Sequence, residues 1–496
     1  MTLFRRRDLI WVPTIARAQD RPRLTHGIQI GDVTADGRAT VWARSDRAAD
    51  LIVAAGGRTY RSATPATAAT GFTARAELTG LAPGAEVQFA ARFGNGDPVN
   101  GRFRTAPRAP RDVRFLWSGD TCGQGYGINP DLGGMRIYET MRKLTPDFFL
   151  HSGDTIYADG PIPAEIKLSG GKVWRNVTSE AKSKVAETLE EYRGNYLYNL
   201  LDENVRRFNA EVPQVWQWDD HEVRNNWSPG SDLSDDPRYT EKNIRTLAAR
   251  GRQAFLEHAP IRTGAGIHRR IGYGPLLDVF VIDMRSFRAA NTADLHEAAG
   301  PDTIFLGAQQ IRWLTRELLQ SRATWKVIAS DMPIGLHVPD GKDSEGRARW
   351  EAVANGEDGP ARGRELEIAV LLRTIKQRRV TGTVWLTADV HYTAAHYYDP
   401  AKAQFTDFDP FWEFVSGPLN AGTFGPGKMD ATFGPQVMFQ KAPPPGQANL
   451  PPSAGLQFFG DVQISAKTRE LTVTLRDLTG AALFTQALAP RSERPA

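Results

Sequence analysis

Four short clusters of residue types that bind metal ions recur along the chain, and each follows an apolar stretch. They are Ser118-Gly119-Asp120-Thr121-Cys122, His151-Ser152-Gly153-Asp154-Thr155-Ile156-Tyr157, Trp218-Asp219-Asp220-His221-Glu222 and Ala388-Asp389-Val390-His391. In an open α/β sheet the C-terminal ends of the strands line one crevice, where ligands bind. Carboxylates, imidazoles, a thiol and a phenol gathered in such a crevice predict a polynuclear metal centre.

Asp154 is the strongest single candidate ligand. Gly153 allows the backbone to turn sharply where the strand ends, and the two oxygens of the carboxylate that follows can bridge two cations. Tyr157 comes three residues later and projects to the same side, where its phenolate can bind a ferric ion. An aspartate after a glycine can equally be a helix cap. Asp120 stands in a matching Gly-Asp turn, and the pair favours metal binding.

Cys122 is the only cysteine of the chain, so it cannot form an internal disulfide. A free cysteine is most often a small buried apolar residue. The surrounding sequence Gly-Asp-Thr-Cys-Gly-Gln-Gly is polar and rich in glycine, which favours another interpretation. Beside a highly charged metal ion the thiol would be deprotonated and protected, as a ligand.

The third cluster places two carboxylates before an imidazole. Neighbouring side chains cannot point the same way from an extended backbone, so we assign Asp220 to metal and His221 to the substrate side. Asn225 or Asn226 could add a neutral oxygen ligand, which suits calcium. The alternative is a capping run ahead of a helix.

In the fourth cluster, Asp389 and His391 are two residues apart, which puts both side chains on one face of an extended segment as a chelating pair. We expect His151 to be buried and hydrogen-bonded rather than a ligand, and His396 to be a satisfied polar residue of the following strand. Five further histidines are left unassigned: His26, His258, His268, His296 and His337.

The elements that position these clusters fall into two parts. Residues 24 to 106 alternate apolar and polar side chains between turn signals, which predicts a small antiparallel β domain like a fibronectin type III sandwich. The proline-rich stretch 106–110 marks a boundary, which gives a domain of residues 20–108 and a second of residues 109–496.

Strands alternate with helices in the second part, which predicts a central sheet covered by helices. The expected helices span residues 135–144, 179–207, 243–258, 309–321 and 365–377, and buried strands are expected at 276–283 and 326–329. Residues 417–455 are rich in glycine and proline and predict one long loop, which could form a lid over the crevice.

Length and charge limit the function classes. A chain of 496 residues exceeds the size of a single core, so two domains are expected. The net charge of +4, from 61 basic and 57 acidic residues, is too small and too evenly spread to indicate nucleic acid binding. Beyond the N-terminus the sequence contains no apolar run of about 18 residues, so no transmembrane span is expected.

The N-terminus resembles a twin-arginine export signal of a bacterial protein. Arg5-Arg6-Arg7 precedes a short apolar segment, and Ala16-Arg17-Ala18 matches a small-x-small cleavage site. We therefore interpret residues 1–19 as a signal segment that the twin-arginine machinery recognises, and the protein as periplasmic or extracellular. The alternative is a frayed basic terminus.

The order Gly-Asp, Gly-Asp-x-x-Tyr, Asp-His-Glu and x-Asp-x-His resembles the metallophosphoesterase superfamily. Trp218-Asp219-Asp220-His221-Glu222-Val223-Arg224-Asn225-Asn226-Trp227 resembles more narrowly the PhoD-like alkaline phosphatases and phosphodiesterases, which are related to purple acid phosphatases. The resemblance implies an α/β fold (α+β): an N-terminal β-sandwich followed by an α/β/β/α catalytic domain.

The resemblance also implies the metals and their ligands. A ferric ion would be held by Cys122, Asp154, Tyr157 and His391, with Asp120 nearby. One or two calcium ions would be bound by Asp154, Asp220 or Asn225, and Asp389. The superfamily has one more histidine ligand, which has no clear counterpart here except Asp331 as a weak candidate.

Metal ions of this kind neutralise phosphate oxygens and generate hydroxide from water at neutral pH. We therefore expect an exported phosphoesterase in which a metal-bound hydroxide attacks a phosphomonoester or phosphodiester. His221 would protonate the leaving oxygen or bind the transition state, and Arg224 would clamp phosphate. Two alternatives remain: a phospholipase-D-like phosphodiesterase acting on lipid head groups, and a non-catalytic binding or adhesion protein, for which only the β-sandwich argues.

Overall fold

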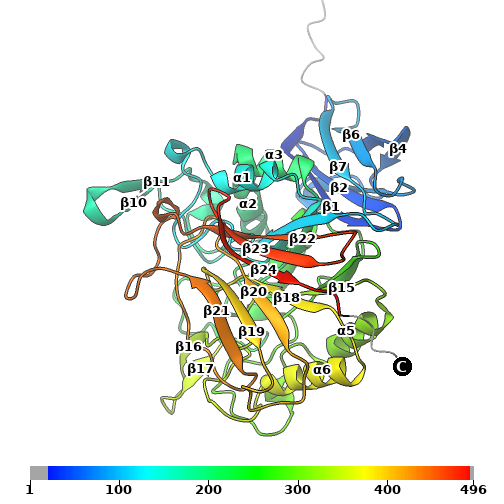
Figure 1. Cartoon of the computed structure of the whole chain (residues 1–496). Coiled ribbons are helices and arrows are strands. Elements are labelled where there is room, and N and C mark those ends of the chain that lie inside the picture. Colours follow the sequence, from blue (N-terminus) through cyan, green and yellow to red (C-terminus); the bar gives the residue numbers. More distant parts are fainter. Residues whose placement is uncertain (1–20, 492–496) are drawn as a thin grey trace, which may run out of the picture.

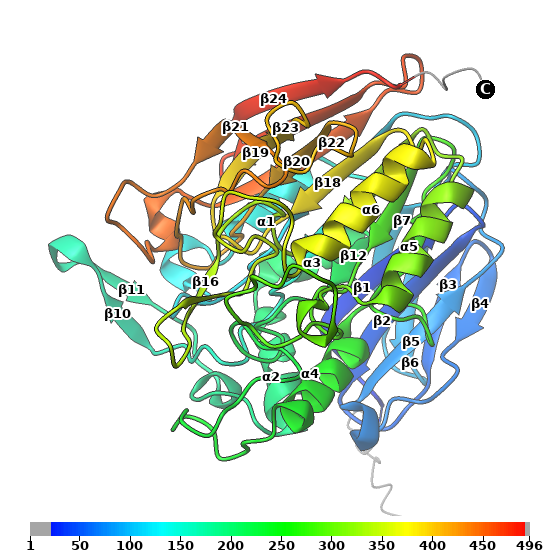
Figure 2. The same cartoon turned by 90° about the horizontal axis from the view of Figure 1, so that it is seen from below.

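The computed structural model of the protein describes residues 21–491, and the expected signal segment lies outside them. Two large sheets pack face to face, and helices cover the outer face of each (Figures 1 and 2). The body of the molecule therefore has four layers, α/β/β/α, which confirms the predicted fold class.

The first sheet supplies the first three acidic clusters. Its strand order is β24-β23-β22-β8-β9-β12-β1-β2-β5. The central strands run parallel: β8 (Val113–Ser118), β9 (Phe148–Ser152) and β12 (Gln214–Gln217). Antiparallel strands extend the sheet beyond β8: β22 (Phe458–Ile464), β23 (Leu471–Asp477) and β24 (Ala482–Leu488).

The second sheet supplies the fourth cluster. Its strand order is β13-β14-β15-β18-β20-β19-β21. Four neighbouring strands run parallel: β14 (Leu277–Val281), β15 (Trp325–Ala329), β18 (Thr383–Thr387) and β20 (Phe411–Val415). The others are antiparallel to their neighbours: β13 (Arg269–Gly272), β19 (Thr393–Tyr398) and β21 (Pro435–Lys441).

Strand β21 lies inside residues 417–455, so the prediction of one long loop there was wrong in part. The strand pairs with β19, from Thr393↔Lys441 to Tyr398↔Pro435. None of its residues is buried and three are exposed, so burial of an apolar face does not specify the strand. The strand exists because a partner elsewhere in the chain offers a free edge.

Apolar side chains fill the space between the two sheets, where Phe115 and Leu150 of the first pack with Val279, Val327 and Leu386 of the second. Helices on the outer face of the first sheet are α1 (Arg136–Lys143), α2 (Leu189–Asn199), α3 (Glu203–Glu211) and α4 (Ile244–His258). The outer face of the second sheet carries α5 (Ala308–Gln320) and α6 (Glu365–Gln377), which lie side by side in Figure 2.

The helix predicted over 179–207 is divided. Helix α2 begins with a capping box. The Thr188 side chain accepts from the Glu191 backbone N–H, and the Glu191 side chain accepts from the Thr188 backbone N–H. It ends at Asn199, and Asp202 caps a new helix, α3, by accepting from the N–H groups of Asn204 and Val205. The other four predicted helices are found within one residue of their expected bounds or at them.

The N-terminal part is a β-sandwich, as predicted, although its likeness to fibronectin type III stays a prediction. One layer contains β1 (Leu24–Thr34), β2 (Arg38–Ser45) and β5 (Thr73–Leu78), and the other contains β4 (Arg58–Arg61), β3 (Leu51–Ala55), β6 (Glu86–Phe93) and β7 (Val99–Arg104). Strand β1 also pairs in parallel with β12 at Gly31↔Gln214. The two expected domains thus share the nine-stranded sheet.

Two small hairpins project on the left in Figure 1: β10 (Glu165–Lys167) with β11 (Val173–Arg175), and β16 (Pro339–Lys342) with β17 (Ala348–Trp350). Among residues 21–491, none of the helices has the length and apolar character that crossing a bilayer requires.

Buried His258 makes stability depend on pH. Its Nδ1 lies 2.8 Å from the Ala254 carbonyl, its ring stacks on Tyr196, and burial lowers its pKa from 6.5 to about 3. Between these two values the unfolded chain binds a proton that the folded protein does not, so acidification destabilises the fold by about 1.4 kcal/mol per pH unit from this group. We expect urea unfolding of His258→Phe to depend less steeply on pH between 6 and 4, by about one proton. An unchanged slope would contradict this assignment.

Gly153 is required where β9 ends. Its φ is +93°, and a Cβ there would lie 2.4 Å from the Asp219 Cβ. Gly170 is a matched control, because its φ is +72° and a Cβ added to it would have nothing within 4 Å. We expect Gly170→Ala to cost about 1–2 kcal/mol from backbone strain alone. Gly153→Ala should cost about 2 kcal/mol more from overpacking, measured by chemical denaturation. Equal losses of stability in the two variants would contradict the predicted clash between a Cβ at position 153 and Asp219.

Candidate metal centre

The four acidic clusters meet at one edge of the two-sheet core. Asp120, Asp154 and Asp220 follow the C-terminal ends of the adjacent parallel strands β8, β9 and β12, and Asp389 follows β18 of the facing sheet. The backbone N–H of Thr121 donates to the Asp154 carbonyl at 2.9 Å, so the first two turns touch directly. The convergence expected from strand-end placement is therefore present.

Four of the candidate ligands have left-handed backbone conformations. The φ angles are 62° at Asp120, 51° at Asp154, 66° at Asp389 and 61° at His391. Such angles are uncommon outside glycine and cost free energy, so they persist only where the surroundings impose them. Here they turn each side chain out of the strand direction at the point where the strand ends.

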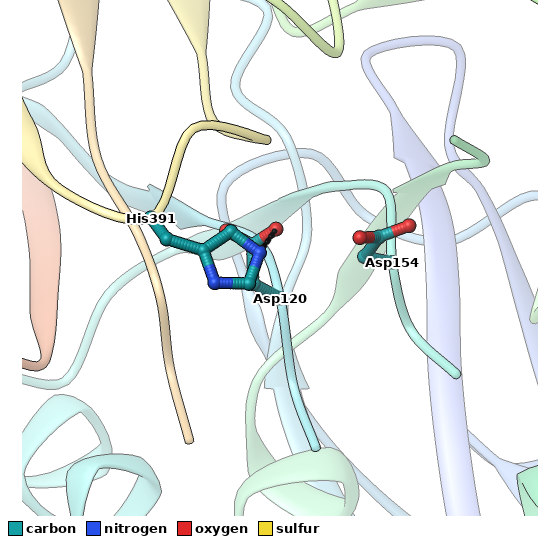
Figure 3. Close-up of side chains that lie close together, drawn as sticks. All are labelled: Asp120, Asp154 and His391. Atoms are coloured by element: carbon teal, nitrogen blue, oxygen red, sulfur yellow. Dashed lines mark ion pairs between the residues drawn. The ribbon is translucent and has the colours of Figure 1, made fainter. Parts of the chain in front are cut away.

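These side chains form three overlapping groups whose potential ligand atoms lie within 4.8 Å of one another. The groups are Asp120-Asp154-His391, Asp154-Asp220-His221 and Asp219-Asp220-Asp389. Figure 3 shows the first, in which the imidazole of His391 lies against the carboxylate of Asp120 and the Asp154 carboxylate faces them. Asp154 belongs to two groups, as a bridging residue must.

Tyr157 completes the first group. Its hydroxyl lies 2.8 Å from His391 Nε2 and 3.5 Å from Asp120 Oδ1. The other imidazole nitrogen, Nδ1, binds the Gly422 carbonyl, which fixes the orientation of the ring. Tyr157 and His391 therefore lie together beside Asp120, whereas Asp389 belongs to another group, so the expected chelating pair of Asp389 and His391 was wrong.

The chemistry of the donor set fits cations. Among the described residues, Asp120 Oδ2, Asp154 Oδ2, Asp219 Oδ2 and Asp220 Oδ1 are buried without a hydrogen-bond partner. Burial raises the pKa of Asp120 to about 8 and that of Asp154 well above its usual value. Buried carboxylate oxygens need a positive partner, and several converging on one point provide a metal site.

Glu222 ties two of the turns together. Its carboxylate accepts the backbone N–H groups of Thr155 at 2.7 Å, Asp219 at 2.8 Å and Asp154 at 3.2 Å. The residue comes last in the Asp-Asp-His-Glu cluster and holds the β9 turn against the β12 turn. The sequence indicated the motif but not this positioning role.

His221 is held by a carboxylate that the sequence analysis missed. Asp159 Oδ1 lies 2.5 Å from His221 Nδ1, and Asp159 Oδ2 accepts the Asn225 backbone N–H at 2.9 Å. The second imidazole nitrogen, Nε2, lies 3.9 Å from Asp220 Oδ1, beside the candidate ligands. Although burial lowers the pKa of His221, the carboxylates of Asp159, Asp220 and Asp154 raise it well above 6.5. Asp159 follows Tyr157 by two residues, and this second carboxylate before a glycine was the available signal.

Three candidate residues are placed apart from the groups. Cys122 packs in an apolar cluster with its thiol donating to the Tyr126 carbonyl at 3.4 Å, and burial raises its pKa to about 12. Arg224 lies 3.6 Å from Asp236 and near the ring of Tyr239. The Asn225 side chain is exposed, while the backbone N–H of Asn226 donates to Asp220.

Two other predictions concern neighbouring residues. Asp331, the weak candidate for an additional ligand, accepts from Arg285 Nε at 3.1 Å and belongs to none of the three groups. His151 is buried and its Nε2 lies 2.6 Å from Thr121 Oγ1, as expected for a hydrogen-bonded residue.

Comparisons with known proteins agree with this geometry. Alkaline phosphatase D of Bacillus subtilis (strain 168) is 26% identical over 379 residues, which cover 72% of this chain and 59% of that protein. The chain therefore spans less than two thirds of the length of this relative.

Two solved structures share the fold. The structure of PhoD, at 19% identity, gives a TM-score of 0.68 and covers 94% of this chain and 89% of that one. A purple acid phosphatase from yellow lupin (Lupinus luteus) seeds, at 11% identity, gives 0.56 and covers 95% of this chain and 74% of that one.

Two family models match successive parts of the chain. The N-terminal domain of PhoD-like phosphatases matches residues 11–107. The model for the phosphatase itself matches residues 115–475, a span that contains all four clusters and the whole of the second sheet. With a match of this extent, the chain belongs to the PhoD-like phosphatase family.

Proposed function

We propose that this protein is a metal-dependent phosphoesterase that hydrolyses phosphomonoesters, phosphodiesters or both. The observation that carries the proposal is the set of buried, unpartnered carboxylate oxygens that follow β8, β9 and β12, in a chain of the PhoD-like phosphatase family. Cations bound there would neutralise phosphate oxygens and lower the pKa of a coordinated water.

The candidate ligands suit two kinds of ion. A ferric ion is assigned to Asp120, Asp154, Tyr157 and His391, because phenolate ligation is compatible with ferric iron. Calcium is assigned to Asp154, Asp220, Asn225 and Asp389, which offer only oxygens. Cys122 stays a predicted iron ligand; binding would require its thiol to leave the Tyr126 carbonyl.

His221 is the proposed general acid. Asp159 binds Nδ1 and so fixes the ring, which leaves Nε2 to hold a proton on the side of the candidate ligands. From there the proton would pass to the leaving oxygen as the ester bond breaks. Arg224 remains a proposed phosphate clamp, and reaching the groups would require it to leave Asp236.

Export is part of the proposal. The paired arginines and the Ala-Arg-Ala site at residues 5–18 support recognition by the twin-arginine machinery and a periplasmic or extracellular location. The substrate is proposed only as a phosphoester, so monoesters and diesters both have to be assayed.

Replacing the bridging residue should remove metal and activity together. We expect Asp154→Asn to lose bound metal, measured by elemental analysis, and hydrolysis of chromogenic monoester and diester substrates, because one oxygen can no longer join the two groups. The same analysis of the parent protein identifies the metals. Full turnover by metal-free Asp154→Asn would overturn the proposal.

Replacing Asp159, which orients the proposed general acid His221, should lower the rate of the chemical step without changing metal content. We expect Asp159→Asn to retain its metal content but lose about 10²-fold or more in kcat, as expected when general acid catalysis is lost. The loss should be greater for an alkyl phosphate than for a 4-nitrophenyl phosphate, because nitrophenolate leaves without a proton. An equal loss for both esters would assign Asp159 a merely structural role.

A further inference from the structure

Arg285 is a fully buried cation beside the candidate metal centre, and the proposed function gives it no role. It follows strand β14, which lies next to β15 in the second sheet, and its side chain is 0% exposed. None of its charge can be balanced by solvent, so its neighbours must balance it.

Four carboxylates surround this guanidinium. Nε lies 2.7 Å from Asp219 Oδ1 and 3.1 Å from Asp331 Oδ2. Nη1 binds Glu351, and Nη2 contacts Asp219 and lies 3.6 Å from Asp389 Oδ1. Two of the four, Asp219 and Asp389, belong to the group that also contains Asp220. Arg285 and a cation at that group therefore compete for the same carboxylates.

The effect of Arg285 on cation affinity has a defined direction. Arginine remains protonated in proteins, so its charge is permanent. A positive charge buried within contact distance of two ligands opposes a divalent cation on them, and the opposition is strong because solvent does not screen it. It also supplies the counter-charge that these carboxylates need when no ion is bound.

We propose that Arg285 is an internal positive charge of the metal centre, which weakens and limits divalent cation binding at Asp219, Asp220 and Asp389. The inference rests on the metal centre of the proposed function and assigns that centre a residue that tunes its occupancy. Asp331 and Glu351 anchor the guanidinium from outside that group of three ligands.

Titration of the full-length chain with Ca²⁺ after chelator treatment tests the proposal. We expect Arg285→Met to bind Ca²⁺ at least tenfold more tightly or to bind one further ion, measured by calorimetry and elemental analysis. Arg285→Lys, which keeps the charge but loses the planar fork, should stay near the parent affinity. Affinity that is unchanged or weaker in Arg285→Met, with no added ion, would overturn the proposal.

Arg288 provides the matched control. It is equally buried and binds Glu351 at 3.3 Å, but among the described residues no ion pair or hydrogen bond joins it to Asp219 or Asp389. We expect Arg288→Met to lose stability without a change in Ca²⁺ affinity. A similar gain of affinity in both methionine variants would indicate a general effect of net charge and would also overturn the specific role of Arg285.

A double variant covers the case in which Arg285→Met does not fold. Arg285→Met with Glu351→Gln removes one charge of each sign, and Glu351 belongs to none of the three groups. The same tightening is expected, and its absence counts against the proposal. A parent protein that bound no divalent cation would instead overturn the metal centre itself, so the two failures are distinguishable.

Discussion

The concentration of buried negative charge at the strand ends is the constraint on which the rest of this structure depends. Four buried aspartates, at positions 120, 154, 219 and 220, come together where water cannot solvate them, and the partly exposed Asp389 lies beside them. Isolated carboxylates in such surroundings would be strongly destabilising. The fold holds them with backbone N–H groups, with the imidazole of His221 and with one guanidinium, and it leaves several oxygens directed at one another.

The position of the site follows from the two-sheet architecture. Three of the acidic turns leave the first sheet and one leaves the second, so the two groups that contain His391 or Asp389 form only where the sheets face each other. The apolar side chains between the sheets, including Phe115, Val279 and Val327, set that relation. Side chains far from the chemistry therefore determine how closely Asp389 and His391 approach Asp120.

Predictions from the sequence were most successful where the residues of a short segment determine its secondary structure by themselves. Helix α6 lies at its predicted bounds, since the apolar face of Glu365–Gln377 repeats with helical period. The strand-end rule brought Asp120, Asp154, Tyr157, Asp220 and His391 to one place. The same rule applied to Asp283-Met-Arg285 would have indicated the residue after β14.

Sequence reasoning failed where a partner distant in the chain decides. Strand β21 needs the free edge of β19. The break between α2 and α3 is different, because its signal, the cap at Asp202, is local and was missed. Cys122 lies in an apolar cluster although its sequence neighbours are polar, because other elements contribute Leu116, Met135 and Tyr198 to that cluster. Asp159 and Glu222 also bind partners on other turns, His221 for the first and Asp154 and Thr155 for the second, and only the tertiary fold brings these together.

The pairing of β1 with β12 has a consequence for the independence of the N-terminal sandwich. A module joined only by a linker can change its orientation or be removed without exposing backbone hydrogen-bonding groups. The N-terminal sandwich instead shares a hydrogen-bonded sheet with the rest of the protein. It is also joined to it by a buried Asp32–Arg269 ion pair. Without it, β12 would become an open sheet edge available to strands of other molecules. The sandwich thus covers the edge of β12, the strand that precedes Asp220, and keeps it from pairing with other chains.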